Sequence, residues 1–207
     1  MTNTRLSLLI VALLLPLVLV GCDAAGGGPI TLSTNSVLDP IRYTFQYKQD
    51  EVRNGNVLVT VSPDSDRRSL DDMLRVEAAT SRSEIQSAKV ERVTFKRVTP
   101  GGSNTGSVSS SSKVFQYLSR VEVRLGSESG PLIAAEEPVP VPDTNAPIDM
   151  NLGPVGSDVE SVDVTSTLKN QSPTPATLDL RVSTPDDVGD PFDEIEIEIY
   201  YSIEVPE

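Results

Sequence analysis

The sequence predicts a mainly β protein, an antiparallel β-sandwich of about seven to nine strands with one short helix. Three observations support this fold class. From residue 30 onward, most stretches that are rich in apolar residues alternate apolar with polar positions. This period of two residues is typical of half-buried strands. Stretches rich in glycine, serine and proline separate these strands, and a single stretch near residue 70 has helical spacing.

The first predicted strand lies in IRYTFQYK, where one face consists of Ile41, Tyr43, Phe45 and Tyr47. Side chains two residues apart point to the same face of a strand, so these four are expected to pack in the core. The same alternation predicts further strands in NVLVTVS, RVEVRL and TLDLRVS, at residues 56–62, 120–125 and 177–183.

Two of the predicted strands change phase along their length. In AKVERVTFKRV, Val90 belongs to one face, whereas Val93 belongs to the other. A β-bulge near Glu91-Arg92 would bring both valines to one face, because a bulge adds one residue to a strand. The alternative interpretation is a strand buried on both faces. The same slip separates Val159 from Val162 in SDVESVDVTSTL.

The predicted helix lies in SLDDMLRVEAA. Ser69 is a suitable N-cap, and Asp71 and Asp72 suit the positive end of the helix dipole. One side of this helix is mainly apolar, so we expect it to close the core rather than to offer a groove to a partner. That side consists of Leu70, Met73, Leu74 and Glu77.

Three stretches are typical of loops. They are the Gly/Ser-rich residues 101–112, the proline-rich residues 136–147 and the turn at 172–176. The proline-rich stretch is expected to be extended and mostly unpaired, because proline has no backbone N–H to donate. No repeat or break in composition divides the chain, so residues 30–207 are predicted to form a single β-sandwich domain.

The last predicted strand, EIEIEIYYSIEV at residues 194–205, places isoleucines on one face and glutamates on the other. The polar face of an antiparallel strand is normally solvated, so we interpret the glutamates as a surface rather than a cation or ligand site. Glutamates in a row repel one another, which favours a neighbouring strand that carries cations. The candidate cations are Lys89, Arg92, Lys96, Arg97, Arg120 and Arg124.

The N-terminus has the features of an export signal. Arg5 precedes fifteen mostly aliphatic residues, 6–20, a length closer to a signal-peptide core than to a membrane span of about 20 residues. The run ends in Leu19-Val20-Gly21-Cys22, which resembles the lipobox of bacterial lipoproteins. The resemblance implies cleavage after residue 21 and acylation of Cys22, while residues 22–29 form the lipidated cysteine and a flexible glycine-rich tether. The alternatives are an ordinary cleaved signal and an uncleaved anchor.

A second resemblance covers about residues 55–205. An LDDML helix, the strand from Ile85 to Phe95, FQYLSRVEVRL from Phe115 and an Ile/Glu-alternating end are similar to a loose group of uncharacterised bacterial lipoproteins with a β-sandwich domain. The resemblance implies a sandwich with a small helix. It implies no activity.

Composition excludes several classes of chemistry. The chain has no histidine, so catalytic triads and metal sites that need histidine cannot form. Its one cysteine is expected to carry lipid, and no Gly-x-x-x-x-Gly-Lys phosphate loop is found. A pair of carboxylates could hydrolyse a glycoside, but any chain with 30 acidic residues contains such pairs. We expect no enzymatic activity, no cofactor and no resident metal.

Calcium binding is a more specific hypothesis than catalysis by a pair of carboxylates. In TPDDVGDPFDE five carboxylates surround Gly189, and calcium prefers such oxygen-rich turns. The spacing matches no EF-hand, and Pro185 and Pro191 favour an ordinary turn. A second candidate is SPDSDRR at residues 62–68, where Arg67 and Arg68 could neutralise the aspartates. We interpret both stretches as solvated turns, and calcium binding by residues 186–194 stays open.

Charge limits the partners. Arg5 is the only charged residue in residues 1–21, so the remainder carries 16 basic and 30 acidic residues, a net charge of −14. Such a chain is a poor ligand for nucleic acid or anionic head groups, and we expect it to reach the membrane only through the lipid on Cys22. The expected partner is an envelope protein or glycan.

The sequence therefore predicts a lipid-anchored, non-enzymatic domain of the bacterial cell envelope, exported from the cytoplasm, that serves binding or envelope structure. The alternative function is a calcium- or carbohydrate-binding adhesin-like module. The third is an enzyme that uses carboxylates. Asp23 resembles an inner-membrane retention signal of some Gram-negative bacteria, but that sorting rule is not general, so both membranes stay open.

Overall fold

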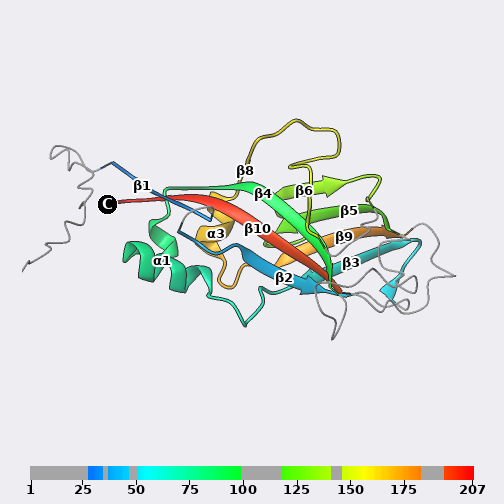
Figure 1. Ribbon diagram of the computed structural model, residues 1–207, viewed down its shortest axis with the longest axis horizontal. Coiled ribbons are helices and arrows are strands. Elements are labelled where there is room, and N and C mark those ends of the chain that lie inside the picture. Colours follow the sequence, from blue (N-terminus) through cyan, green and yellow to red (C-terminus); the bar gives the residue numbers. More distant parts are fainter. Residues whose placement is uncertain (1–27, 35–36, 47–50, 99–117, 141–145, 183–193) are drawn as a thin grey trace, which may run out of the picture.

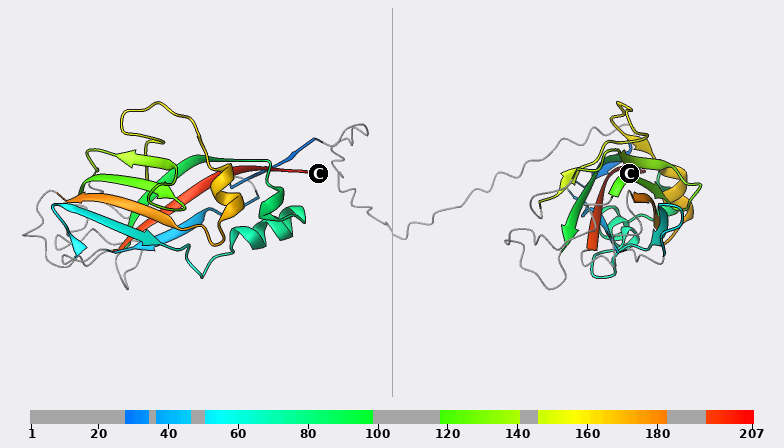
Figure 2. Two further views of the ribbon diagram at one scale, coloured as in Figure 1. Left: turned by 180° about the vertical axis from the view of Figure 1, so that it is seen from behind. Right: turned by 90° about the vertical axis from the view of Figure 1, so that its right-hand side faces the viewer.

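The computed structural model consists of two antiparallel β-sheets packed face to face, with a helix at one end (Figure 1). The two layers are also visible from behind and end-on (Figure 2). The predicted fold class is confirmed. The structure describes residues 28–34, 37–46, 51–98, 118–140, 146–182 and 194–207.

The first sheet has six strands. Strands β10 and β4 form its centre, with β1 and β2 along the other edge of β10 and β7 and β8 along the other edge of β4. The strands are β1 (Ile30–Ser33), β2 (Ile41–Phe45), β4 (Ser87–Val98), β7 (Ile148–Asp149), β8 (Val162–Asp163) and β10 (Glu194–Val205).

The second sheet has four strands in the order β3-β9-β5-β6. They are β3 (Asn56–Val61), β9 (Ala176–Val182), β5 (Leu118–Leu125) and β6 (Leu132–Glu136). The predicted strands at residues 56–62, 120–125 and 177–183 therefore form three neighbours of one sheet. Their inward residues join those of the first sheet in one buried apolar cluster.

The predicted bulge in β4 is confirmed. Arg92 lies opposite Tyr200 and Val90 lies opposite Tyr201, so Glu91 is the extra residue. Because of this extra residue, both Val90 and Val93 are fully buried in the core.

Strand β10 is not a border strand. It pairs with β4 from Glu194 to Glu204, with β2 from Ile195 to Ile199 and with β1 from Ser202 to Val205. Its isoleucines and Tyr201 face the core and are almost completely buried. Its glutamate face therefore lies in the middle of a sheet, flanked by the side chains of β2 and β4.

The predicted helix is confirmed as α1 (Leu70–Ala78). The Ser69 hydroxyl accepts a hydrogen bond from the backbone N–H of Asp72 at 3.1 Å, which caps the helix as the sequence predicts. Leu70, Met73 and Leu74 are buried against the core. The helix ends at Ala79, which adopts a left-handed conformation.

The structure contains two helical elements that the sequence did not predict, α3 (Thr165–Asn170) and the 3₁₀ helix η2 (Arg82–Glu84). The α3 helix follows the stretch where the alternation slips. The Asp163 carboxylate accepts hydrogen bonds from the backbone N–H and the hydroxyl of Thr165, which start the helix, and Leu168 is then fully buried.

Several predictions concern residues outside the described ranges. They include the export signal and Cys22, the Gly/Ser-rich residues 101–112 and most of the Asp-rich turn. Of the proline-rich stretch, Glu136 ends β6 opposite Val121, and Val139 is buried. No helix in the described part of the chain is both long and apolar enough to cross a membrane.

Candidate functional site

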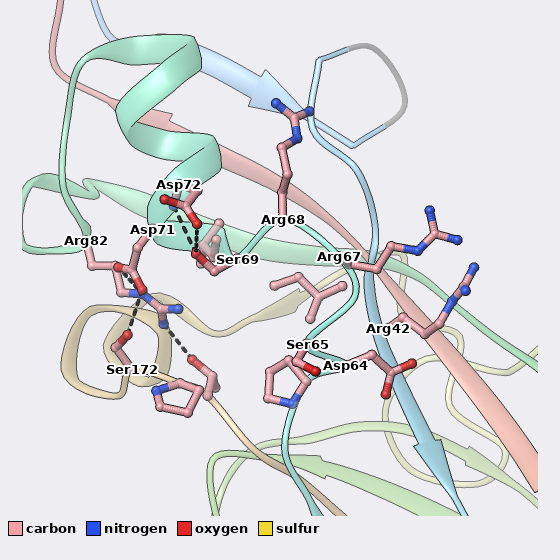
Figure 3. Close-up of a pocket in the computed structure, with 15 residues that line it drawn as sticks. Arg42, Asp64, Ser65, Arg67, Arg68, Ser69, Asp71, Asp72, Arg82 and Ser172 are labelled. Atoms are coloured by element: carbon pink, nitrogen blue, oxygen red, sulfur yellow. Dashed lines mark hydrogen bonds and ion pairs between the residues drawn. The ribbon is translucent and has the colours of Figure 1, made fainter.

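A pocket of about 450 Å³ lies where the start of β2, the loop from β3 to α1, the start of α1 and the turn at residues 172–174 meet (Figure 3). Four arginines line it together with three aspartates and several serines. The charged and hydroxyl side chains of the lining include Arg42, Asp64, Arg67, Asp71, Arg82 and Ser172. Small-ligand sites commonly measure about 300–1,000 Å³, so the volume is adequate for one small molecule.

Arg82 joins the parts of the pocket. It is only 8% exposed, and its Nε donates to the Asp71 carboxylate at 2.7 Å. Its Nη1 donates to the Thr174 hydroxyl at 2.7 Å, to the Leu168 carbonyl at 3.2 Å and to the Gln171 carbonyl. One guanidinium therefore connects η2 with α1, α3 and the turn that precedes β9.

Asp71 lies between this arginine and the turn. One carboxylate oxygen accepts from Arg82, and the other accepts from the Ser172 hydroxyl at 2.6 Å. Partial burial alone would raise the pKa of Asp71, but the hydrogen bonds from Ser172 and Arg82 and the charge of Arg82 together lower it. Asp71 therefore stays ionised at neutral pH and fixes the orientation of the guanidinium.

The arginines of residues 62–68 do not pair as the sequence suggested. Arg68 is ion-paired with Asp39 and with Glu77, each at 3.0 Å. Asp64 instead accepts hydrogen bonds from the backbone N–H and the hydroxyl of Thr44, at 3.1 and 2.8 Å. Within the described ranges, Arg67 has no ion-pair partner and is exposed.

A second cluster of charges covers the outer face of the first sheet. Glu196 was expected to be solvated, but it is only 6% exposed, so that prediction is wrong at this position. Its carboxylate is ion-paired with Arg42 of β2 at 3.1 Å and with Lys96 of β4 at 2.5 Å. The neighbouring strands cover Glu196 from both sides because β10 is central.

The cluster continues along β10. Glu198 accepts from Arg42 at 2.8 Å and from the Tyr200 hydroxyl at 3.1 Å. The guanidinium carbon of Arg92 lies 5.1 Å from the centre of the Tyr200 ring, and Arg92 donates to Asp149 at 2.5 Å. A chain of alternating charges thus crosses β2, β10, β4 and β7.

The candidate cations lie on two different sheets. Lys96 lies directly opposite Glu196, as predicted, and Lys89 lies opposite Ser202. Arg120 and Arg124 are on β5 of the other sheet, where both pair with Glu122, so they are not neighbours of the glutamate row. Arg97 lies opposite Ile195 in the backbone register.

Sequence reasoning missed Arg42 and Arg82, which are central to the two clusters. Arg42 could have been found, because it occupies the polar face of the predicted strand IRYTF. For Arg82 the only local signal is its place in SRSEIQ, which matches no motif.

Among the described residues, no group of three or more acidic or cysteine side chains could hold a metal ion, and this includes the candidate at residues 62–68.

Four described carboxylates have a lowered pKa, and two of them, Asp71 and Glu198, are partly buried in the charged clusters, so they predict how stability depends on pH. Burial alone would raise the pKa of Glu198, but the hydrogen bonds from Arg42 and Tyr200 and nearby positive charge lower it, as for Asp71. A carboxyl group whose pKa is lower in the folded state stabilises the protein above the unfolded pKa of about 4. This contribution is lost as the pH falls through the folded pKa.

Urea midpoints measured from pH 7 to pH 2 should therefore fall most steeply below about pH 4. Glu198→Gln should make this fall shallower, because one of the responsible groups no longer titrates. A midpoint that rises as the pH falls would contradict the assignment.

Comparisons with known proteins do not identify a family. No family model matches the chain, and no curated protein matches it. A chain from Desmodium yellow mottle tymovirus matches with 14% identity and a TM-score of 0.25, covering 100% of this chain and 95% of the viral one. A tobacco necrosis virus chain matches with 7% identity and a TM-score of 0.27, covering 87% and 97%. Scores this low support no statement about function.

Proposed function

We propose that the chain is a lipid-anchored, non-enzymatic domain of the bacterial cell envelope that presents a β-sandwich for binding or envelope structure. The observation that carries the proposal is Cys22, the only cysteine, placed at the end of the apolar run in Leu19-Val20-Gly21-Cys22. The thiolate of such a cysteine is the nucleophile that accepts the lipid.

The start of the fold agrees with a short anchor. Only residues 23–29 separate Cys22 from the first residue of β1. Seven residues span at most about 25 Å when fully extended. An anchored domain would therefore keep Ile30 close to the bilayer, together with α1 and the C-terminus, which lie at the same end of the sandwich (Figure 1).

Two features of the pocket favour a binding role. A general acid that works near neutral pH needs a raised carboxyl pKa, whereas the pKa of Asp71 is lowered. The Ser172 hydroxyl donates to this carboxylate, and the sequence contains no histidine that could activate it as a nucleophile. Arginines, carboxylates and hydroxyls of this kind hold a ligand by hydrogen bonds.

Lipidation can be tested directly. Expressed with its signal in a bacterial host, the protein should incorporate labelled fatty acid and partition into the detergent phase. Cys22→Ala should do neither, since the acyl acceptor is removed. A wild-type protein that stays in the aqueous phase and carries no label would refute the proposal.

The carbohydrate-binding alternative has an observation in its favour, the hydrogen-bonding groups of the Arg82 pocket. The calcium-binding form has no such support among the described residues, and its Asp-rich stretch lies largely outside them.

A further inference from the structure

We propose that the pocket beside Arg82 binds a neutral saccharide through its hydroxyl groups. The inference rests on the proposed function of an envelope-binding domain, since it names the ligand class of that domain. It is carried by three features of the pocket: an available donor on a fixed guanidinium, a balanced set of charges, and apolar surface beside them.

The donor is Nη2 of Arg82. The other two guanidinium nitrogens are fully engaged, Nε with Asp71 and Nη1 with three acceptors. Among the described residues, none accepts a hydrogen bond from Nη2, and Arg82 belongs to the lining of the pocket. In Figure 3 it is the one guanidinium nitrogen of Arg82 that has no dashed line, and it points toward the interior of the pocket.

This donor is held rigidly. Arg82 cannot turn away without losing several hydrogen bonds inside a buried environment, so its two Nη2 hydrogens keep one direction. A donor that is already oriented costs little conformational entropy when a ligand binds. The pocket is therefore prepared for an oxygen acceptor at this point.

The charges favour a neutral ligand over an anion. Arg42, Arg68 and Arg82 are each neutralised by carboxylates, and only Arg67 lacks an ion-pair partner among the described residues. The whole chain carries a net charge of −13, which repels anions at long range. The lining still offers both donors and the acceptor oxygens of Asp64.

Hydroxyl groups fit this mixture, because each of them donates one hydrogen bond and accepts others. A saccharide presents several hydroxyls beside a face of C–H groups. The pocket provides matching apolar surface from Ile41, Leu70, Pro63 and Pro173. No aromatic side chain of the described residues lines it, so affinity for a single sugar is expected to be weak.

The direct test is methyl NMR on the full chain in detergent, with labelled isoleucine, leucine and threonine. Ile41, Leu70 and Thr174 each place a methyl-bearing side chain in the lining. Titration with glucose, galactose, mannose and N-acetylglucosamine should shift these three signals saturably for at least one sugar. Sodium acetate and sodium phosphate at the same concentrations should leave them in place.

A pair of matched variants locates the site. Ser65→Phe should fill the pocket from an exposed position and weaken the apparent affinity by about tenfold or more. Ser127→Phe makes the same change at an exposed serine outside the lining and should bind like the wild type. Both positions are exposed, so both variants are expected to fold.

Three outcomes would overturn the inference: no saturable shift with any of the four sugars, shifts confined to methyl groups outside the pocket, or a stronger response to acetate or phosphate. None of them bears on Cys22, because lipidation is measured separately. Conversely, a chain that fails to take up fatty acid but shows the sugar response would refute the proposed lipidation of Cys22 and support saccharide binding by the pocket.

Discussion

Replacing Arg82 by methionine is expected to lower the free energy of unfolding by about 3–5 kcal/mol. Methionine fills much of the same space but donates no hydrogen bond. The carbonyls of Leu168 and Gln171 and the hydroxyl of Thr174 would each lose a donor. A buried acceptor without a partner costs about 1–3 kcal/mol, and the ion pair with Asp71 is lost as well.

The matched control is Arg75→Met on the same part of the chain. Arg75 pairs with Asp72 at 2.5 Å, but its side chain is 73% exposed, so the expected change is within about 0.5 kcal/mol. Urea unfolding followed by circular dichroism measures both variants, since the chain has no tryptophan to report by fluorescence. If Arg82→Met were no less stable than Arg75→Met, the buried hydrogen bonds would contribute nothing.

The same contacts relate the pocket to the fold. Arg82 forms hydrogen bonds with residues that lie 86 to 92 positions after it in the sequence. Its site therefore exists only when the region around η2 and the region from α3 to β9 are both folded. We therefore expect the pocket to form together with the sandwich.

The strands were predictable because their signal is local. Each inward residue of IRYTF, RVEVRL and TLDLRV is buried, as the alternation indicated. The bulge was predictable for the same reason, since Val90 and Val93 can share a face only if one residue is inserted. In these stretches the period of the sequence equals the period of the structure.

The two charged clusters, around Arg82 and around Glu196, were not predictable from such patterns. An arginine is usually exposed, so nothing in SRSEIQ indicates that Arg82 is buried. Two of its four acceptors are backbone carbonyls, which every residue has, and these come from α3 and the residue that follows it, which the alternation did not reveal. Only the tertiary fold brings these atoms together.

The glutamates of β10 illustrate the limit most directly. Alternation correctly separates the two faces of the strand, but it does not say how much the neighbouring strands cover the polar face. Strand β10 is central, so Arg42 and Lys96 reach Glu196 from both sides. A position that appears solvated in the sequence is thereby removed from water.

Glu196→Gln is therefore expected to lower the free energy of unfolding by about 1–3 kcal/mol, well above the change of 0.5 kcal/mol or less that a solvated strand face would give. Glutamine keeps the shape of the side chain but removes the charge. Lys96 would then lose its carboxylate in a partly buried position, whereas Arg42 keeps Glu198. Lys96→Met combined with Glu196→Gln should recover part of the loss, because no unpaired ammonium remains.

Glu204→Gln is the matched control, since Glu204 lies on the same face of the same strand but forms no ion pair within the described ranges. Its effect should stay within about 0.5 kcal/mol. Urea midpoints of the two single variants and the double variant, measured in one buffer, decide between the interpretations. Equal small effects at Glu196 and Glu204 would mean that the carboxylate of Glu196 is hydrated in solution. A larger effect at Glu196 that Lys96→Met relieves would identify the ion cluster as the cause.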